Sequence, residues 1–479
     1  MKTGFLILGG GPTGLGAAWR LQEIKHENWL LLDASDDVGG LARSFVDEHG
    51  FTWDIGGHVQ FSHYAYFDGV MDQLLGADDW LNHQRESWVW IRGKFIPYPF
   101  QYNIHELPPG DLDRCLAGVV DALKTPVKRV ENFRDWILAN FGAGIAEVFM
   151  LPYNFKVWAY PPEMLNAVWV GERVAAIDLK RVLHNLVYGQ PDISWGPNRT
   201  FRFPRRGGTG AIWKKCAERL PPDKLALRDA AVEVDLPRRI VKTSSGLTIQ
   251  YDSLLSTIPL SRLVKISGQN QFAPLVSRGL LFSTSNIFGI GLKGRPPEQL
   301  RTKCWMYFPE SDCPFYRVTV FSNYSPNNVP QPDGQWSLMA EVSESPCKPE
   351  NQATMVESVI TGLLNTRLIN SRSDIVSVWK YRAEWGYPTP SLHRDEALNE
   401  ILPFFEQNGI SPRGRFGAWK YEVSNQDHSF MQGVESVERL FNGKPEITVA
   451  DPNHANSKYH PWPFERWEAR PNAGYNPVG

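Results

Sequence analysis

The sequence has few cysteines, almost no net charge and no long hydrophobic run. Its 479 residues include five cysteines, without a CxxC pair and without a histidine at the spacing of a metal ligand set. An odd, scattered set of cysteines is typical of a reducing compartment and argues against a structural zinc site, so we expect no metal. A net charge of −2 excludes the positive field that attracts nucleic acid.

Signals for export or membrane insertion are also missing. The apolar run at the N-terminus is too short for a signal peptide and leads directly into a glycine loop. We find no stretch as long as a membrane span. The sequence therefore predicts a soluble, cytoplasmic protein of two or three domains, with no membrane partner, and it leaves a homo-oligomer open.

The most informative feature that is present is a glycine-rich turn near the start. A short apolar run is followed by Gly9, Gly11 and Gly14 in a GxGxxG pattern, and then by an alanine-rich helical pattern. These glycines permit a tight turn, close approach of a pyrophosphate, and close packing of helix on strand. A second apolar run, 29–32, ends in Asp33, where a carboxylate meets the ribose hydroxyls of a dinucleotide. The pattern predicts a Rossmann-like dinucleotide-binding domain.

Two further diglycines favour FAD over a nicotinamide cofactor. A nicotinamide domain continues from its second strand into another helix and strand, whereas here each diglycine can bring the backbone close to a flat or charged ligand. The alternative is a pair of ordinary loop turns. The first segment resembles the second phosphate-contacting stretch of flavoenzymes related to amine oxidases. The candidate FAD contacts in these two segments are Gly40, Leu41, Arg43, Ser44, Gly56 and Gly57.

Hydrophobic patterns divide the rest of the chain. Residues 86–97 predict a hairpin, residues 108–188 have helical spacing, and alternating runs between 285 and 322 predict an antiparallel sheet. We expect an α/β fold with a Rossmann-like FAD-binding domain, a helical insertion domain and an antiparallel β-sheet domain that binds substrate. The expected ranges are 1–105, 200–262 and 408–450 for the discontinuous FAD-binding domain, 106–199 for the helical domain, 263–407 for the sheet domain and 451–479 for an irregular tail.

Several long peptides resemble one family. They are Gly56–Tyr64, Pro97–Gln101, Pro152–Trp158, Gly171–Ala176, Trp195–Asn198, Phe315–Arg317, Phe321–Tyr324, Arg415–Gly417 and Asn425–Ser429. In this order they resemble the eukaryotic-type UDP-galactopyranose mutases, which are amine-oxidase-like flavoproteins, over about residues 3–450. The resemblance implies an isomerase that interconverts UDP-galactopyranose and UDP-galactofuranose without net redox change. It further implies that N5 of reduced FAD attacks the anomeric carbon while UDP leaves.

The resemblance also implies roles for individual residues. Arg173 and Arg317 would clamp the pyrophosphate, although either arginine alone reads as a surface ion-pair partner. His58 would sense the redox state of the flavin rather than transfer a proton. Two loops, 171–178 and 194–200, would act as flaps over the substrate.

Three further sets of contacts follow from the resemblance. The substrate-binding set comprises Phe61, Tyr98, Gln101, Phe149, Tyr153, Asn154, Trp158, Arg173, Asn198, Trp305, Tyr307, Arg317, Tyr324, Tyr387 and Tyr421. The C-terminal FAD contacts are Gly414, Arg415, Asn425, Gln426 and Ser429. NADPH is the expected reductant, with Arg85 and Ser87 as its contacts.

Two other functions remain open at this point. An amine-oxidase-type FAD oxidoreductase would use the same glycine signature but needs a cavity selective for an amine or an apolar substrate. A non-catalytic flavin-binding scaffold would bind FAD without responding to UDP. Neither alternative gives a paired-arginine clamp a purpose.

Overall fold

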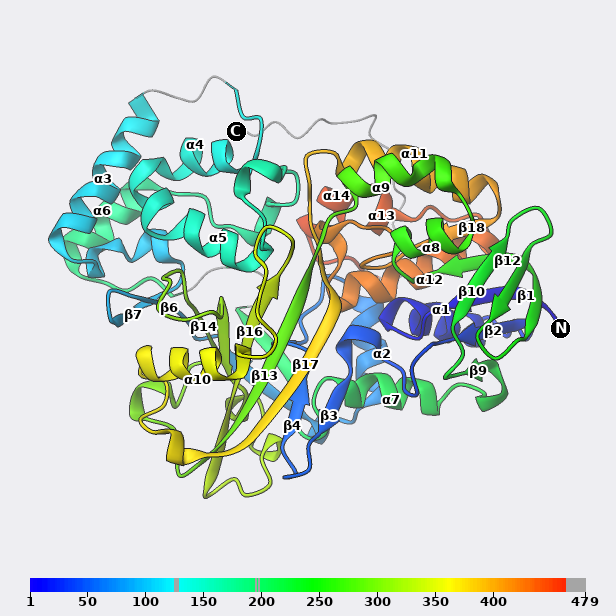
Figure 1. Ribbon diagram of the computed structural model, residues 1–479, viewed down its shortest axis with the longest axis horizontal. Coiled ribbons are helices and arrows are strands. Elements are labelled where there is room, and N and C mark those ends of the chain that lie inside the picture. The colour runs from blue at the N-terminus through cyan, green and yellow to red at the C-terminus, as the bar shows by residue number, and fades with distance from the viewer. Residues whose placement is uncertain (125–128, 194–195, 197–198, 462–479) are drawn as a thin grey trace.

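The structure, a computed structural model, describes residues 1–124, 129–193, 196 and 199–461. Figure 1 shows two large sheets beside each other, with a group of helices next to the second sheet at the upper left. This arrangement confirms the expected fold class: a Rossmann-like region, a helical region and a mainly antiparallel sheet.

The first sheet carries the glycine-rich turn. Its strand order is β10-β11-β12-β1-β2-β9, and β18 lies beside β12. Strands β12, β1, β2, β9 and β18 run parallel to one another, so their carboxyl ends share one edge. Strand β11 is antiparallel to both of its neighbours, β10 and β12. The strands are β1 (Lys2–Leu8), β2 (Trp29–Leu32), β9 (Leu225–Ala226), β10 (Ala231–Asp235), β11 (Ile240–Thr243), β12 (Thr248–Ser256) and β18 (Ile410–Pro412).

Both faces of this sheet are buried, which explains why β1 and β2 are continuous apolar runs. Phe5 and Ile7 of β1 face one hydrophobic core, and Leu6 and Leu8 face the other. The first core includes α1 (Pro12–Glu23), α2 (Ala65–Leu74), α7 (Gly210–Glu218) and α12 (Gln426–Asn442). The second core includes α8 (Leu260–Ile266), α9 (Ala273–Gly279) and α11 (Arg394–Gln407).

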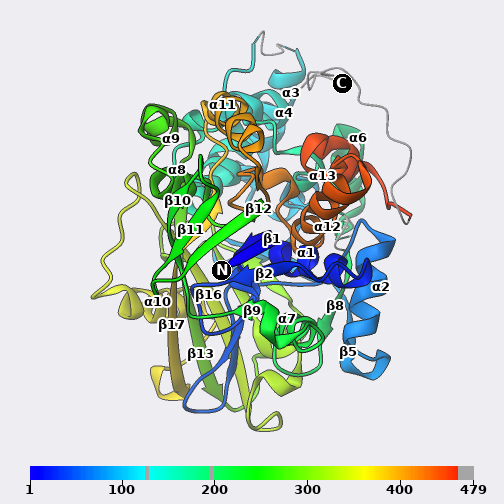
Figure 2. The same ribbon diagram turned by 90° about the vertical axis from the view of Figure 1, so that its right-hand side faces the viewer.

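Helices α1 and α12 lie side by side on the sheet (Figure 2). Glycines make this approach possible. A Cβ at Gly16 would lie 2.3 Å from the Phe430 carbonyl oxygen, and a Cβ at Gly433 would lie 1.9 Å from the Thr13 carbonyl oxygen. Helix α12 ends before Gly443, which caps it in the left-handed conformation.

The second sheet has the order β17-β13-β16-β15-β14-β6-β7 and is antiparallel except between β14 and β6. Helix α10 (Met355–Asn365) covers one face, and the aromatic side chains of Phe51 and Trp53 pack on the other. The strands are β6 (Ser87–Ile91), β7 (Lys94–Pro97), β13 (Phe282–Lys293), β14 (Trp305–Tyr307), β15 (Arg317–Val320), β16 (Gln335–Glu344) and β17 (Ile375–Pro388).

The predicted hairpin is confirmed as β6 and β7, joined through Arg92 and Gly93. It lies within the range 1–105 but belongs to the second sheet rather than the first. Two small ribbons complete the strands. They pair β3 (Ser44–Val46) with β4 (Thr52–Asp54), and β5 (Trp80–Gln84) with β8 (Thr200–Pro204).

The helical region spans α3 (Pro109–Lys124), α4 (Phe133–Ile145), a π-helical turn (Ala146–Met150), α5 (Leu151–Trp158) and α6 (Leu179–Tyr188). The stretch Phe133–Trp158 is long and apolar enough to cross a membrane, which corrects the expectation that no stretch reaches that length. More than half of its most apolar window is buried inside the protein, and Gly142 interrupts it with φ +71°. Both features are typical of a core helix.

The chain after α12 differs from the expected irregular tail. Helices α13 (Ile447–Ala450) and α14 (Pro452–Ser457) follow, and His460 forms a β-bridge with Tyr64. The expectation for 451–479 is therefore corrected over 452–460, because backbone pairing with residues 63–65 orders this segment. Residues 462–479 lie outside the described part of the chain.

We predict that Gly433→Ala lowers the midpoint of thermal unfolding, because its Cβ would overlap the Thr13 carbonyl oxygen and overpacking costs about 1–3 kcal/mol. Gly69→Ala in α2 is the matched control, since no atom lies within 4 Å of its Cβ position. There the gain in helix propensity predicts an unchanged or higher midpoint. Equal midpoints for both variants, measured by calorimetry, would contradict this account of α1–α12 packing.

Candidate functional site: a cationic cavity between the two sheets

A cavity of about 840 Å³ is lined by the first sheet, the helical region and the second sheet. It brings most of the predicted site residues together. They are Gly9, Gly11, Asp33, Gly40, Leu41, Arg43, Gly56, Gly57, His58, Phe61, Arg85, Tyr98, Gln101, Phe149, Tyr153, Asn154, Trp158, Arg173, Trp305, Tyr307, Arg317, Tyr387, Arg415, Tyr421, Asn425, Gln426 and Ser429.

Five predicted residues lie behind the lining. Gly14 and Gly414 allow close backbone packing there, because a Cβ would lie 1.9 Å from the Gly9 oxygen and 2.4 Å from the Thr13 hydroxyl, respectively. The Ser44 hydroxyl bonds to the buried Asp54 carboxylate. The other two are Ser87, which is buried on β6, and Tyr324, which is fully buried among aromatic rings that include Phe201 and Phe203. Asn198 lies outside the described residues.

One end of the cavity has the form of a dinucleotide cradle. The turn after β1 and the first diglycine turn, at Gly40, meet here. Among the described residues beyond its chain neighbours, only the Gly40 Cα, at 3.8 Å, would lie within 4 Å of a Cβ at Gly11. Asp33 lies at the carboxyl end of β2, where it accepts hydrogen bonds from the backbone N–H groups of Gly10 (2.6 Å) and Ser35 (2.7 Å). A narrow backbone cradle with a carboxylate beside it fits a dinucleotide such as FAD.

Two helix N-termini open toward this cavity. Helix α1 begins at Pro12 after Gly11, and helix α12 begins at Gln426 after Asn425; neither capping residue makes a side-chain hydrogen bond. The first N–H groups of both helices are therefore available to a ligand, and both helix dipoles favour negative charge.

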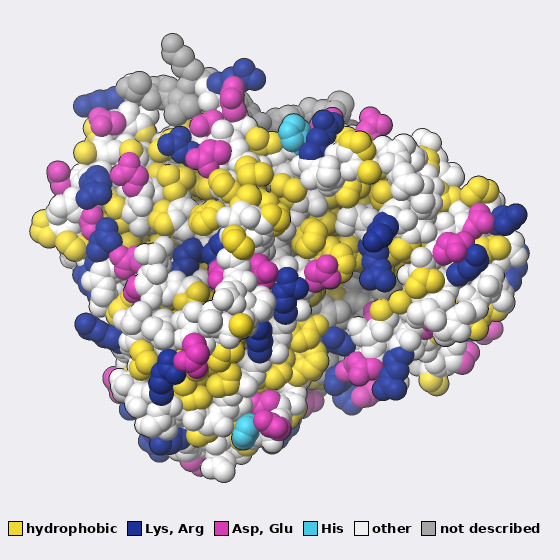
Figure 3. All heavy atoms as spheres, viewed as in Figure 1, with side chains coloured by type: hydrophobic (Ala, Val, Ile, Leu, Met, Phe, Trp, Pro, Cys, Tyr) yellow, Lys and Arg dark blue, Asp and Glu magenta, His cyan; other side chains and the backbone are white. Residues whose placement is uncertain are grey.

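The lining carries an excess of positive charge. It includes seven arginines and four carboxylates, whereas the face of the molecule in Figure 3 shows basic and acidic side chains interspersed. The arginines are Arg43, Arg85, Arg173, Arg262, Arg317, Arg382 and Arg415; the carboxylates belong to Asp33, Asp229, Glu341 and Glu384. A cavity of this composition favours polyanionic ligands such as diphosphates.

Glu341 on β16 holds one of these arginines and a backbone turn together. Its carboxylate accepts two hydrogen bonds from Arg317, at 2.7 and 2.8 Å, one from the Tyr316 hydroxyl at 2.7 Å and one from the Gly57 N–H at 3.1 Å. Burial alone would raise the pKa of Glu341, but the Arg317 charge and these hydrogen bonds outweigh it and lower the pKa. The Glu341 side chain is therefore ionised and fixes Arg317 beside the second diglycine turn, at Gly57.

Arg173 reaches the cavity from the other side. It lies in a short turn, Gly171–Arg173, of the helical region. Its guanidinium donates a hydrogen bond to the Glu422 carbonyl oxygen at 2.8 Å and lies 5.3 Å from the centre of the Tyr421 ring. No described carboxylate is paired with this arginine, so its charge remains available to a ligand.

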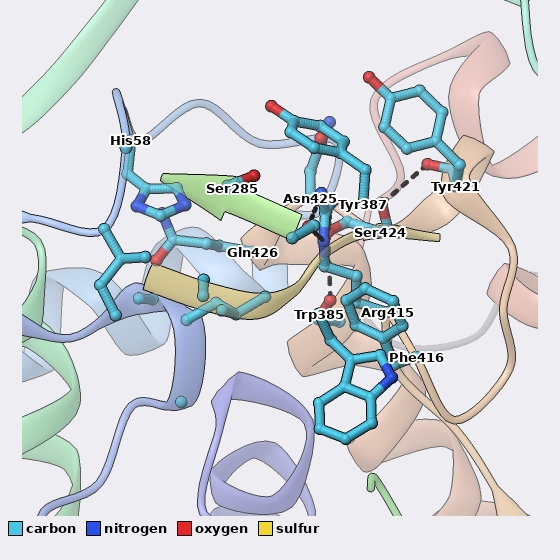
Figure 4. Close-up of a pocket in the computed structure, with 18 of the residues that line it drawn as sticks. His58, Ser285, Trp385, Tyr387, Arg415, Phe416, Tyr421, Ser424, Asn425 and Gln426 are labelled. Atoms are coloured by element: carbon cyan, nitrogen blue, oxygen red, sulfur yellow. Dashed lines mark hydrogen bonds between the residues drawn. The ribbon is translucent and has the colours of Figure 1, made fainter. Parts of the chain in front are cut away.

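Arg415 is partly buried and has no carboxylate partner among the described residues. Its guanidinium donates to the Gly386 carbonyl oxygen at 2.9 Å and to the Ser424 hydroxyl at 2.9 Å, and lies 4.7 Å from the centre of the Tyr387 ring (Figure 4). Burial lowers the pKa of Arg415 from its ordinary value, and the nearby tyrosines oppose that shift. Such an arginine is stabilised when an anion binds beside it.

His58 follows the second diglycine and is partly buried in the lining of the cavity (Figure 4). Burial lowers its pKa to about 4; the Glu341 charge opposes this shift, and the charges of Arg415 and Arg317 add to it. Nδ1 of His58 has no hydrogen-bond partner among the residues that the structure describes. The imidazole is therefore neutral at pH 7, with one ring nitrogen available to a bound group.

The other end of the cavity is aromatic. Phe149 and Tyr153 stack with ring centres 5.2 Å apart, and Tyr307 contacts Tyr153 edge-on at 5.2 Å. The Trp305 indole N–H donates to the Tyr307 hydroxyl at 2.6 Å, which confirms that the two side chains share a face of β14. Trp158 is almost fully buried, with its ring 4.8 Å from that of Tyr421. Stacked rings at this position suit a flat base.

Sequence reasoning missed several lining residues. Glu341 had no motif, since it is one position in an apolar strand, and Trp169 is not among the predicted site residues. The segment 257–262 also lines the cavity, because it follows β12 at the carboxyl edge of the sheet. Because ligands bind at the carboxyl ends of parallel strands, the position of 257–262 at a strand end could have predicted that it lines the site.

One group of possible metal ligands exists among the described residues. His63, Asp427 and His428 have ligand atoms within 4.8 Å of one another and are buried. Nδ1 and the backbone N–H of His63 both contact Oδ2 of Asp427, at 2.8 and 3.0 Å. The group lies outside the cavity lining, where it fixes the first turn of α12 against residue 63.

Comparison with known proteins identifies the family. Residues 7–74 match the model of the NAD(P)-binding Rossmann-like domain. The chain is similar to the protein in a crystal structure of reduced UDP-galactopyranose mutase, with 47% identity over 97% of this chain and 99% of that chain and a TM-score of 0.93. The chain belongs to the UDP-galactopyranose mutase family. It is therefore an isomerase with a flavoprotein fold.

Two more distant oxidases share only the fold with this mutase-family chain. A putative protoporphyrinogen oxidase from Exiguobacterium sp. 255-15 has 14% identity over 91% of this chain and 98% of its own, with a TM-score of 0.69. Putrescine oxidase has 14% identity over 92% of this chain and 99% of its own, with a TM-score of 0.59.

We predict that His58 makes this mutase-family protein sensitive to acid. Because its folded pKa of about 4 lies below the ordinary value of 6.5, its contribution to stability is complete above pH 6.5 and is lost as pH falls toward 4. His58→Gln should flatten the decline in thermal midpoint over that range, whereas replacing the exposed His49 by Gln should not. Parallel pH profiles for wild type and His58→Gln would refute the assignment.

Proposed function

We propose that the protein interconverts UDP-galactopyranose and UDP-galactofuranose with reduced FAD and no net redox change, and that it is of the eukaryotic type. One observation carries the proposal. Arg173 of the helical region and Arg317 of the second sheet line the same cavity as the GxGxxG turn of the first sheet. Such a cavity accommodates a dinucleotide cofactor and a second diphosphate ligand together.

The chain's own residues account for binding and orientation. Arg173 and Arg317 bind the diphosphate from opposite regions and stabilise its charge as the bond to the sugar breaks. Glu341 keeps Arg317 in position. Phe149 and Tyr153 offer a stacking surface for uracil. When bound and reduced, FAD supplies N5 as a nucleophile toward the anomeric carbon, with UDP as the leaving group.

His58 acts in this proposal as a neutral partner of the flavin. A histidine that is neutral at pH 7 and has an unused ring nitrogen can accept or donate one hydrogen bond without carrying charge. The Gly57 N–H is bound to Glu341, so the turn that carries His58 is linked to Arg317. We infer that this turn responds to the redox state of the flavin and does not transfer protons to the sugar.

The amine-oxidase alternative is disfavoured by electrostatics. An amine substrate carries positive charge near neutral pH, and a cavity with an excess of arginines repels it. A diphosphate is attracted by the same charges. The alternative nevertheless makes a distinct prediction, which is release of peroxide with an amine.

We further infer that NADPH reduces the flavin from the same cavity. Arg85, Tyr98 and Gln101 line it, and Ser87 is buried directly beside them on β6. All five cysteines are free, which suits the reducing conditions of the cytoplasm. The loop 171–178 carries Arg173, and we propose that it closes on the substrate as a flap.

The decisive assay follows UDP-galactofuranose conversion to UDP-galactopyranose by chromatography, with the flavin reduced by dithionite. We predict turnover by reduced enzyme only, and a loss of about 10- to 100-fold in kcat/KM for Arg173→Ala, because a charge-assisted hydrogen bond to the diphosphate is removed. Arg317→Lys should lose a similar factor, since it keeps the charge but not the forked geometry. Arg301→Ala, at an exposed arginine that forms an ion pair with Glu298 and lies outside the lining, is the control.

Turnover by the oxidised enzyme would contradict the proposed role of the flavin. Peroxide release with an amine, or unchanged kcat/KM in both arginine variants, would favour one of the two alternatives. Flavin content and thermal midpoint are measured for each variant, so that loss of fold is separated from loss of binding.

A further inference from the structure

The chain segment 446–460, here termed the C-terminal strap, is anchored along its whole length. Glu446 accepts two hydrogen bonds from the buried Arg413, at 2.7 and 2.6 Å. Thr448 bonds through its N–H and hydroxyl to Glu435, at 2.9 and 2.8 Å. At the far end, the His460 N–H donates to the residue 63 carbonyl at 2.6 Å. So many buried contacts indicate that the strap occupies one defined position.

The strap meets the candidate active site at one backbone carbonyl. Nδ2 of Asn456 in α14 donates to the Glu422 carbonyl oxygen at 2.9 Å, and Arg173 donates to the same oxygen at 2.8 Å. Nδ2 of Asn456 also donates to the Pro452 carbonyl at 2.7 Å. Because both partners are carbonyl acceptors, the amide orientation of Asn456 is fixed by chemistry.

Neighbouring contacts make this carbonyl rigid. The Glu422 carboxylate forms two hydrogen bonds with the buried Arg394, at 2.7 and 3.0 Å. The Lys420 ammonium donates to the Val449 carbonyl of the strap at 2.7 Å. The residue between them, Tyr421, places its ring against the Arg173 guanidinium. The acceptor of Arg173 is thus held from both the strap and α11.

The turn that carries Arg173 has few contacts of its own. It is a single 3₁₀ turn without a side-chain cap, closed by a hydrogen bond from the Arg173 N–H to the Val170 carbonyl at 2.8 Å. Gly171 has φ +37° and no atom within 4 Å of its Cβ position. Helix α14 packs directly against this turn. The strap is therefore a principal external support of the turn.

We propose that the C-terminal strap positions Arg173 for the diphosphate, with Asn456 as the positioning residue. The inference rests on the proposed function in one respect, which is that Arg173 binds the diphosphate. Asn456 lies outside the cavity lining. It acts by holding the Glu422 carbonyl, so that Arg173 is oriented toward the cavity before the ligand arrives.

The test compares Asn456→Ala with Asn453→Ala, an exposed asparagine of the same helix, in the FAD-loaded full-length enzyme. Two quantities are measured: amide hydrogen exchange of residues 168–178 without ligand, and the affinity for UDP by titration. We expect several-fold faster exchange and about three- to tenfold weaker UDP binding in Asn456→Ala, because one hydrogen bond is lost. KM for the sugar nucleotide should rise by the same factor, with kcat within about twofold.

A second variant keeps the test decisive if Asn456→Ala loses its fold. Tyr459→Phe removes the 2.7 Å hydrogen bond from the exposed end of the strap to Asp68, far from the Glu422 carbonyl. We expect a smaller effect in the same direction for exchange and for UDP affinity.

Exchange and UDP affinity equal to those of Asn453→Ala would overturn the proposal. Faster exchange with unchanged UDP affinity would overturn it too, because the strap would then order the turn without positioning Arg173. If the wild type itself does not bind UDP, the proposed function fails. Exchange of residues 168–178 still decides in that case whether the strap supports the turn.

Discussion

An excess of positive charge around the cavity is the constraint on which the rest of this structure depends. Arginines cannot lose their charge, so every one that faces the cavity must be stabilised by neighbouring groups. Arg317 has Glu341, whereas the described partners of Arg173 and Arg415 are carbonyl oxygens, a hydroxyl and ring faces. Two helix N-termini add further positive potential. The excess positive charge of the cavity is therefore balanced only when polyanionic ligands occupy it.

The fold places these charges by joining three regions at one point. The glycine turns belong to the first sheet, Arg173 to the helical region and Arg317 to the second sheet. Close packing of α1 on α12 aligns their N-termini. The Glu341 contacts link the second diglycine turn, at Gly57, to Arg317. A ligand that bridges the regions therefore contacts residues that are distant in the sequence.

Local parts of the fold could be predicted from the sequence. The GxGxxG turn, the acid at Asp33 and the hairpin of β6 and β7 follow from spacing and turn chemistry. The partners of these strands could not, because β6 pairs with β14 across more than two hundred residues and β12 inserts beside β1. Sequence periodicity contains no information on such long-range pairing. The helix α14 was missed since it is short and its order comes from tertiary contacts.

The candidate site was predicted unevenly for the same reason. Residues beside glycine turns or in long distinctive peptides, such as His58 and Arg173, line the cavity. No sequence motif marked Glu341, because its role comes from three groups that donate hydrogen bonds to it only in the folded structure. Tyr324 lies among buried aromatic rings rather than in the lining, which the spacing of aromatic residues did not distinguish.

The central claim is that the cavity supports an isomerisation in which the flavin is reduced once and reused. The most direct test is the number of turnovers per reducing equivalent. The enzyme is reduced anaerobically with one equivalent of dithionite, freed of excess reductant, and given UDP-galactofuranose while the flavin absorbance is recorded. The account predicts many product molecules per flavin and a spectrum that stays reduced. One product per flavin, with reoxidation during the reaction, would contradict it.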